Sequence, residues 1–204
     1  MLSANEIIAL HDRLTIVWHH ADADAHAQEA EGWLELVARQ HRANFELWHT
    51  EDEARAPGAS DAEIAEVKRR VDRTNQLRND LAEEMDRTLL GWLETQRLVN
   101  AKAQLHSESP GLIIDRLSIL ALKIYHTREE AERADGPAGH AERNRERLGT
   151  LEEQRADLAA CLDHMWRETV RGTRRFKVYR QLKMYNDPSL NPAIYGKPGE
   201  SARK

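Results

Sequence analysis

The sequence predicts an all-α fold: an elongated antiparallel bundle of four long helices, with a short helix before them and an extended tail after them. Apolar residues recur at three- and four-residue spacing over long stretches, and β-branched alternation is nowhere sustained. The 10 glycines and 6 prolines of the 204 residues gather in a few places, which we interpret as breaks between helices. We therefore expect a bundle domain over residues 1–185 and an extended tail over residues 186–204. The tail should pack on the bundle, with its last residues flexible.

Capping signals and chain breaks place the helices in order. Ser3 and Glu6 match a capping box, as do Ser60 and Glu63, and this predicts helix starts near residues 4 and 61. Pro110 suits the first turn of a later helix, and a Gly-Pro dipeptide ends that helix. The five helices are therefore expected over residues 4–20, 28–55, 61–98, 110–134 and 138–172.

Charge is distributed unevenly along a chain whose net charge is −5. Residues 1–100 hold 11 Lys and Arg against 20 Asp and Glu, whereas residues 101–204 hold 19 against 15. Nine of those later cations lie in residues 171–204, beside two carboxylates. A nucleic-acid binder usually spreads positive potential over a whole face, so this acidic body argues against nucleic-acid binding. We expect the basic end to dock on the chain's own acidic half.

Other patterns exclude some locations and some chemistries. The uninterrupted apolar runs are too short for a transmembrane helix, and no basic-then-apolar leader opens the chain. The single cysteine, Cys161, cannot form an internal disulfide or a cysteine-based zinc cage. We expect a cytoplasmic protein, with Cys161 packed in the core beside Leu158, Leu162 and Met165.

Polar residues occupy positions where a bundle needs apolar ones. The third helix carries a stripe at three- and four-residue spacing that includes Arg78: Ile64, Val67, Val71, Thr74, Arg78, Leu81, Met85, Thr88 and Trp92. The second helix places Gln40, Asn44 and Glu51 on its seam. Because a lone buried charge is strongly unfavourable, two interpretations stay open. Glu51 and Arg78 form an ion pair that fixes the helix register, or they line one wet cavity between the helices.

The fourth helix adds a mixed polar face opposite its apolar arc. Asp115, Ser118 and His126 fall close together on this face, with Arg116 and Lys123 beside them. Ile119 and Leu122 lie within the same arc, so we expect the face to be half-buried against another helix.

Four sequence blocks carry a family resemblance. They read LWHTEDEAR (47–55), VDRTNQLRND (71–80), SESPGLIIDRLSIL (107–120, running on to His126) and KMYNDP (183–188) with Asn191-Pro192. Through these blocks the chain resembles the bacterial family called domain of unknown function 4254, whose members are helical. The resemblance implies an association with cell-surface polysaccharide synthesis, since members are often encoded near glycosyltransferases. It implies no particular reaction.

Together these observations predict a protein that acts on a phosphorylated sugar or a nucleotide-sugar, as an enzyme or as a binding protein. Six residues carry cations or amides that could bind the phosphate and the sugar: Arg55, Asn75, Arg78, Asn79, Arg116 and Lys123. Candidate catalytic groups are two histidines that could move a proton and two carboxylates that could orient it: His49, His126, Glu51 and Asp115.

A divalent metal such as Mg²⁺ is a candidate cofactor, with Asp52 and Asp80 as its candidate ligands. The alternative is a non-catalytic helical partner of a glycosyltransferase or polysaccharide-assembly enzyme, whose polar seams only fix helix pairing. Association of the chain with itself is left open.

Overall fold

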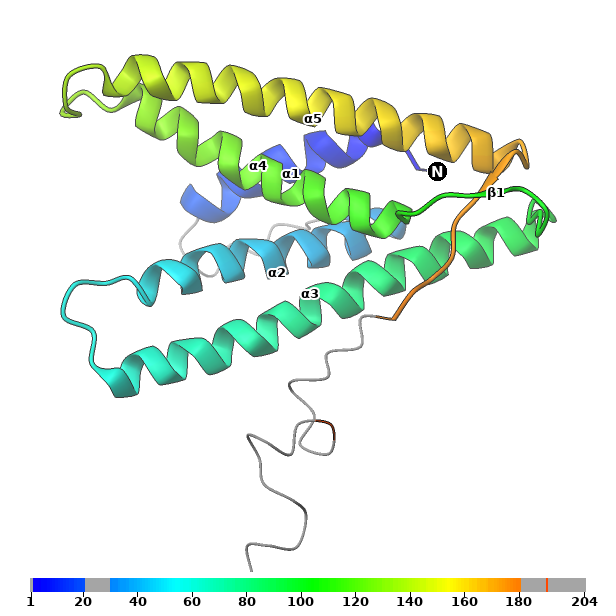
Figure 1. The fold of residues 1–204 in the computed structure, drawn as a ribbon, viewed down its shortest axis with the longest axis horizontal. Coiled ribbons are helices and arrows are strands. Elements are labelled where there is room, and N and C mark those ends of the chain that lie inside the picture. The colour runs from blue at the N-terminus through cyan, green and yellow to red at the C-terminus, as the bar shows by residue number, and fades with distance from the viewer. Residues whose placement is uncertain (1, 21–29, 181–189, 191–204) are drawn as a thin grey trace, which may run out of the picture.

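The computed structural model describes residues 2–20, 30–180 and 190 of the chain. This part confirms the all-α prediction of an antiparallel bundle with a shorter first helix (Figure 1). Its helices are α1 (Ala4–His20), α2 (Trp33–Glu53), α3 (Asp61–Thr95), α4 (Pro110–Glu132) and α5 (His140–Val170). Two short strands, β1 (Gln104–Leu105) and β2 (Arg174–Arg175), pair in parallel.

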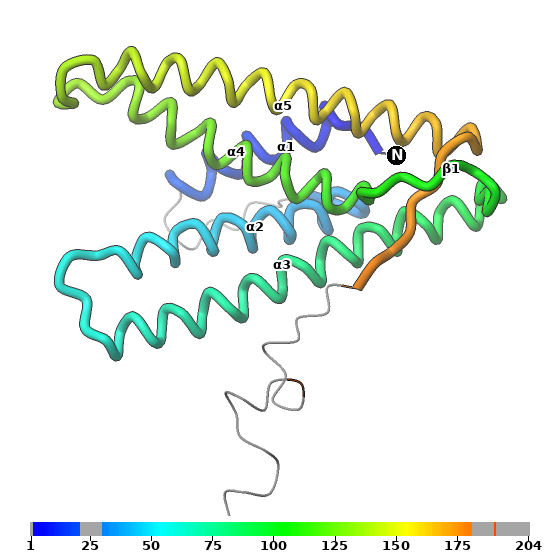
Figure 2. Tube along the Cα trace, viewed as in Figure 1, coloured from blue at the N-terminus to red at the C-terminus, as the bar shows by residue number. Residues whose placement is uncertain are grey.

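Helix α4 is the centre of the bundle, because it contacts each of the other four helices. Helices α2 and α3 form one antiparallel hairpin and α4 and α5 form another (Figure 2). Helix α1 packs against α2, α4 and α5. The β1–β2 pair joins the segment before α4 to the segment after α5. Polar residues on α2, α3 and α4 can therefore meet only along the inner faces of these helices.

The helix boundaries follow local backbone chemistry. The Ser60 hydroxyl accepts a hydrogen bond from the Glu63 N–H at 3.3 Å, and the Glu63 carboxylate accepts one from the Ser60 N–H at 2.8 Å, which confirms the second capping box. Helix α2 begins at residue 33 rather than 28, after Gly32, whose φ of 59° is left-handed. Helix α3 ends at Thr95, and Arg97 beyond it has a φ of 57°.

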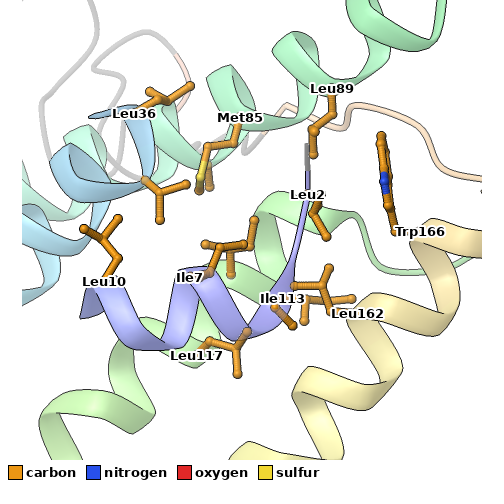
Figure 3. Close-up of a cluster of buried hydrophobic side chains, with 14 of the residues drawn as sticks. Leu2, Ile7, Leu10, Leu36, Met85, Leu89, Ile113, Leu117, Leu162 and Trp166 are labelled. Atoms are coloured by element: carbon orange, nitrogen blue, oxygen red, sulfur yellow. The ribbon is translucent and has the colours of Figure 1, made fainter. Parts of the chain in front are cut away.

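The apolar core lies where all five helices converge. Figure 3 shows these side chains pointing toward one another: Leu2, Ile7, Leu10, Leu36, Met85, Leu89, Ile113, Leu117, Leu162 and Trp166. Sequence reasoning was wrong about part of the α3 stripe, since Thr88 is exposed and Leu89 and Leu93 are buried in its place. A strict 3-4 spacing drifts by about 20° per heptad around a straight α-helix, and over a helix of 35 residues this moves the buried face by one position.

Cys161 is exposed, so its predicted place in the core is wrong. The buried residues of its part of α5 are Ala159, Leu162 and Met165, and the thiol faces a groove toward α4 instead. Phe176, at the start of the chain after β2, is buried in the core. The expected tail over residues 186–204 lies outside the described residues, apart from Leu190. Within the described ranges, no helix combines the length and the apolar character that crossing a bilayer requires.

Candidate functional site

A hydrogen-bonded polar cluster occupies the inner faces of α2, α3 and α4. Its centre is the buried carboxylate of Asp115, which accepts hydrogen bonds from the side-chain amides of Asn44 at 3.0 Å and Gln40 at 2.5 Å. The Asn44 amide also donates to the hydroxyl of Ser118 at 2.9 Å. From α3, the Arg78 Nε lies 3.5 Å from the Asp115 Oδ1. The polar residues on the three seams therefore meet in one place.

Burial and charge act in opposite directions on Asp115. Removal from water is the larger effect and raises the pKa of its carboxyl group, although the Arg78 guanidinium and the hydrogen bonds from Asn44 and Gln40 act in the opposite direction. The Arg78 side chain keeps 24% of its surface exposed. It can therefore neutralise Asp115 at one end and still meet a ligand.

The ion pair of Arg78 is with Asp115 and not with Glu51. Glu51 lies 3.5 Å from Arg55, one turn further along the same chain segment. Glu51 and Arg78 nevertheless line one pocket of about 300 Å³ between α2, α3 and α4. Of the two arrangements that the sequence left open, the Glu51–Arg78 ion pair is thus absent, and a cavity lined by both residues is present. The residues around it are Asn44, Leu47, Trp48, Glu51, Asp52, Arg55, Arg78, Ile119 and Leu122.

Other sequence-predicted residues lie elsewhere. Arg116 and Lys123 line a separate groove of about 790 Å³ between α4 and α5, where Arg116 binds the Glu108 carboxylate at 3.0 and 3.1 Å. Of the residues that the structure describes, only Ile119 borders both hollows. Arg116 and Lys123 therefore do not belong to the Arg78 pocket. Because successive residues on a helix point about 100° apart, α4 distributes its polar residues to both of its sides.

Three predicted residues on α3 are also separate from the Arg78 pocket. Asn79 lies beside a small hollow near Asp86, and Asp80 is exposed and accepts a hydrogen bond from Gln76 at 2.8 Å. Asn75 has a buried side-chain oxygen without a hydrogen-bond partner among the described residues.

The metal ligands that the sequence suggested do not form a site in the described residues. Asp52 is exposed and pairs with Arg55 at 3.3 Å, and neither Asp52 nor Asp80 belongs to a group of three metal-capable side chains.

Such a group is formed instead by His19, His49 and His126, from α1, α2 and α4. One ring nitrogen of each lies within 4.8 Å of those of the other two. Burial lowers the pKa of His19, although its bond to the Thr15 carbonyl oxygen acts in the opposite direction.

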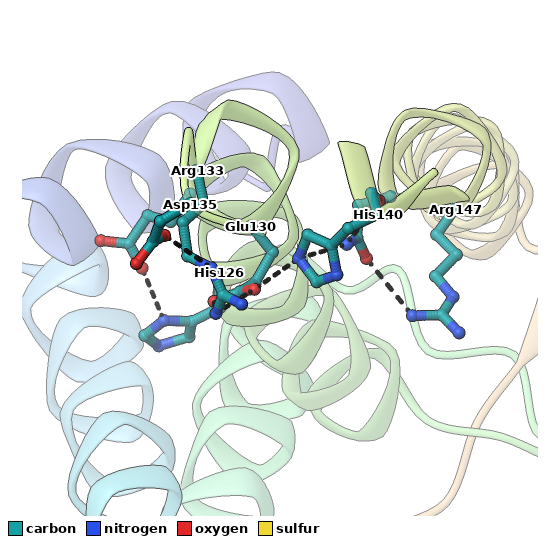
Figure 4. Close-up of polar contacts among 8 residues, drawn as sticks. His126, Glu130, Arg133, Asp135, His140 and Arg147 are labelled. Atoms are coloured by element: carbon teal, nitrogen blue, oxygen red, sulfur yellow. Dashed lines mark hydrogen bonds and ion pairs between the residues drawn. The ribbon is translucent and has the colours of Figure 1, made fainter. Parts of the chain in front are cut away.

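The end of α4 that carries His126 is tied to α5 by ionic contacts (Figure 4). The His126 Nδ1 lies 2.9 Å from a carboxylate oxygen of Glu129. One turn on, the Glu130 carboxylate contacts Arg133, just beyond the end of α4, at 2.9 Å and His140 at the start of α5 at 2.7 Å. The Glu130 contacts tie the end of α4 to the start of α5, and the Glu129 carboxylate orients the His126 ring.

Two further histidines, His41 and His11, which the sequence analysis missed, are buried between the same three helices. The His41 ring contacts the hydroxyls of Thr15 at 3.0 Å and Ser118 at 2.7 Å and the backbone oxygen of His11 at 3.1 Å, which joins α1, α2 and α4. Burial lowers the pKa of His41 to about 3, and it lowers the pKa of the fully buried His11 well below its usual value. Both rings are therefore neutral at pH 7.

A sequence signal for these histidines exists. His41, Phe45 and His49 recur every four residues, and so do Thr15 and His19. This spacing places each set on one helix face.

Comparison with known families gives one finding. A family model described as "Protein of unknown function (DUF4254)" matches residues 34–178, which is more than half of the chain. Neither curated proteins nor solved structures give a match. The matched region includes α3, α4 and all of α2 except its first residue, and thus the whole Arg78 pocket.

Proposed function

Because the chain belongs to the DUF4254 family, we propose a function for the pocket that its matched region contains: binding of a phosphorylated sugar or a nucleotide-sugar. This is in keeping with the association with cell-surface polysaccharide synthesis that the family resemblance implies. The observation that carries the proposal is the placement of Arg78, which is held by buried Asp115 while part of its guanidinium side chain faces the pocket.

The pocket offers the chemistry that such a ligand needs. Arg78 and Arg55 present guanidinium groups, whose paired N–H donors match phosphate oxygens. Glu51 and Asp52 can accept hydrogen bonds from sugar hydroxyls, and Trp48 offers an aromatic surface for a sugar ring or a base. The volume of about 300 Å³ is at the lower end of the range for small-molecule sites. A sugar phosphate fits this size, and a nucleotide-sugar would extend beyond it.

A thermal-shift screen of the full chain tests this function. The panel contains inorganic phosphate, glucose, glucose 1-phosphate and UDP-glucose, so that the anion and the sugar are varied separately. A ligand at 100 times its Kd stabilises the folded state by about 2.7 kcal/mol. We expect a clear rise in Tm with at least one phosphorylated sugar and none with glucose.

Two arginine variants on α3 show whether binding occurs in this pocket. Arg78→Met should abolish the shift, because it removes the guanidinium from the pocket. Arg87→Met is the matched control, since Arg87 is exposed on α3 and pairs loosely with Glu83 at 3.8 Å. If no phosphorylated compound shifts Tm, or if Arg78→Met binds as the wild type does, the proposed function is wrong. The first result would favour the non-catalytic partner in its place.

A further inference from the structure

The cluster of His19, His49 and His126 has the features of an unassigned metal site. The three residues are far apart in sequence and come from three helices, yet their ring centroids lie only 5.0 to 5.8 Å apart. Among the described residues, these three histidines form the group of potential metal ligands in which one donor atom from each residue lies within 4.8 Å of the other two.

Hydrogen bonds determine which nitrogen each ring offers. The His19 Nδ1 lies 2.6 Å from the Thr15 carbonyl oxygen, and the His49 Nδ1 lies 2.8 Å from the Phe45 carbonyl oxygen. A carbonyl oxygen only accepts, so both Nδ1 atoms carry the proton and donate it. In the neutral ring the lone pair is then on Nε2. The same holds for His126, whose Nδ1 donates to the Glu129 carboxylate at 2.9 Å.

Two of these Nε2 atoms make no hydrogen bond to the part of the protein that the structure describes. The Nε2 atoms of His19 and His126 are buried and have no hydrogen-bond partner among the described residues. Buried polar atoms are nearly always paired, and an unpaired one indicates a missing water, ion or ligand. Two such atoms beside a third histidine indicate a shared ligand.

We propose that His19, His49 and His126 bind one divalent transition-metal ion of the zinc class through their Nε2 atoms. Imidazole nitrogen suits Zn²⁺, Co²⁺, Ni²⁺ and Cu²⁺, whereas Mg²⁺ prefers oxygen ligands. Three protein ligands leave one position of a tetrahedral ion open to water, which is the pattern of catalytic rather than structural zinc sites. Around such an ion the nitrogens are separated by about 3.3 Å, so the three rings would move closer together on binding.

The surroundings orient the rings as metal-binding histidines are usually oriented. Hydrogen bonding of the second nitrogen to a carboxylate or carbonyl oxygen, as all three rings have here, fixes the tautomer and increases ligand basicity. Flat stacking adds to this, since His19 lies on Tyr125 at 4.2 Å and His126 on Trp48 at 4.9 Å between ring centroids. Trp48 also lines the Arg78 pocket, so the two sites are neighbours, although neither depends on the other.

Isothermal titration of the EDTA-treated full chain with ZnCl₂, and separately with CoCl₂, tests this site. We expect one ion per chain, a rise in Tm, and for Co²⁺ the visible absorption of a four- or five-coordinate ion. MgCl₂ should give no heat from this site. Absence of Zn²⁺ binding, or binding that only exposed histidines support, overturns the assignment.

Histidine variants distinguish this cluster from other histidines. His49→Phe and His126→Phe keep an aromatic ring in the packing but remove the ligand atom, and each should weaken Zn²⁺ binding by at least 100-fold. His164→Phe is the matched control, because His164 is 65% exposed on α5 and should bind as the wild type does. Circular dichroism confirms that each variant is folded.

A variant of the supporting carboxylate keeps the test valid if the phenylalanine variants do not fold. Glu129→Gln leaves all three ligands in place and removes only the carboxylate behind His126. Loss of such a partner typically weakens metal affinity 10- to 100-fold, and that is the expected result. Unchanged affinity in Glu129→Gln and in the folded phenylalanine variants would show that the ion binds elsewhere.

Discussion

A single glycine sets the close approach of α4 to α3, and replacing it should be severely destabilising. A Cβ atom added at Gly111 would overlap the backbone oxygen of Ala82 and lie 3.0 Å from the Asp86 Cγ. The overlapping oxygen belongs to a helix backbone, so relief requires one helix to move. In addition, the Gly111 N–H donates to the Asp86 carboxylate at 2.7 Å, and this buried bond would be strained or lost.

The magnitude follows from these two contacts. Overpacking of a tight interior typically destabilises by about 1–3 kcal/mol, and leaving a buried polar group unsatisfied adds about 1–3 kcal/mol. The higher helix propensity of alanine offsets this loss by about 1 kcal/mol of unfolding free energy. Gly111→Ala should therefore lower the free energy of unfolding by roughly 1–5 kcal/mol.

Gly149→Ala is the matched control for this substitution. Gly149 also lies inside a helix, but a Cβ there would meet nothing within 4 Å. This change should stabilise by about 0.5–1 kcal/mol. Urea unfolding of both variants, followed by far-UV circular dichroism, measures the difference. Equal stability of the two variants would refute the close packing of α3 on α4.

Three further predictions concern titration and exposure. Burial lowers the pKa of His41 to about 3, from 6.5 when unfolded, so its contribution to stability is complete above pH 6.5 and is lost as the pH falls toward 3, by about 1.4 kcal/mol per pH unit. Urea unfolding between pH 7 and 5 should therefore show that the free energy of unfolding falls less steeply with pH in His41→Gln than in the wild type, and an equal dependence on pH in the two proteins would contradict this. The pKa of Asp86 is raised to about 6, from 3.8, so its ionisation destabilises the folded state as the pH rises from 3.8 to about 6. In the same assay Asp86→Asn should be more stable than the wild type at pH 7 by up to about 3 kcal/mol, and it should lose that advantage by pH 4. Cys161 should react with a thiol reagent in the native protein, as an exposed thiol does, and protection until unfolding would show that it is buried after all.

The fold was predictable because its signals are local. The capping box at Ser60 and Glu63 and the proline in the first turn of α4 are properties of short segments, and both are in place. The errors arose where geometry accumulates over distance. Thr88 is exposed because the buried stripe of a long helix drifts, and Cys161 is exposed because an apolar neighbourhood in sequence does not fix which face of the helix is covered.

The site was predictable only as a set of oddly placed polar residues. Arg78 in an apolar stripe correctly indicated a buried partner, but periodicity cannot say which of several carboxylates on other helices that partner is. In the structure Arg78 pairs with Asp115 of α4, whereas Glu51 of α2 pairs with Arg55. His19 was missed because a residue in the last turn of a helix has no stripe beyond it, and only the packing of α1 on α4 brings it near His126.

The most direct test of the account replaces the Arg78–Asp115 pair by uncharged groups and measures stability and binding together. Arg78→Met alone leaves a buried carboxylate without its cation, and breaking a buried pair in this way typically destabilises by about 3–5 kcal/mol. Adding Asp115→Asn removes that charge while keeping an oxygen for the Asn44 and Gln40 amides. If the pair exists to hold an anionic ligand, the double variant should regain at least wild-type stability in urea and still show no Tm shift with the phosphorylated sugar that shifts the wild type. A double variant that binds that sugar as the wild type does would contradict the account.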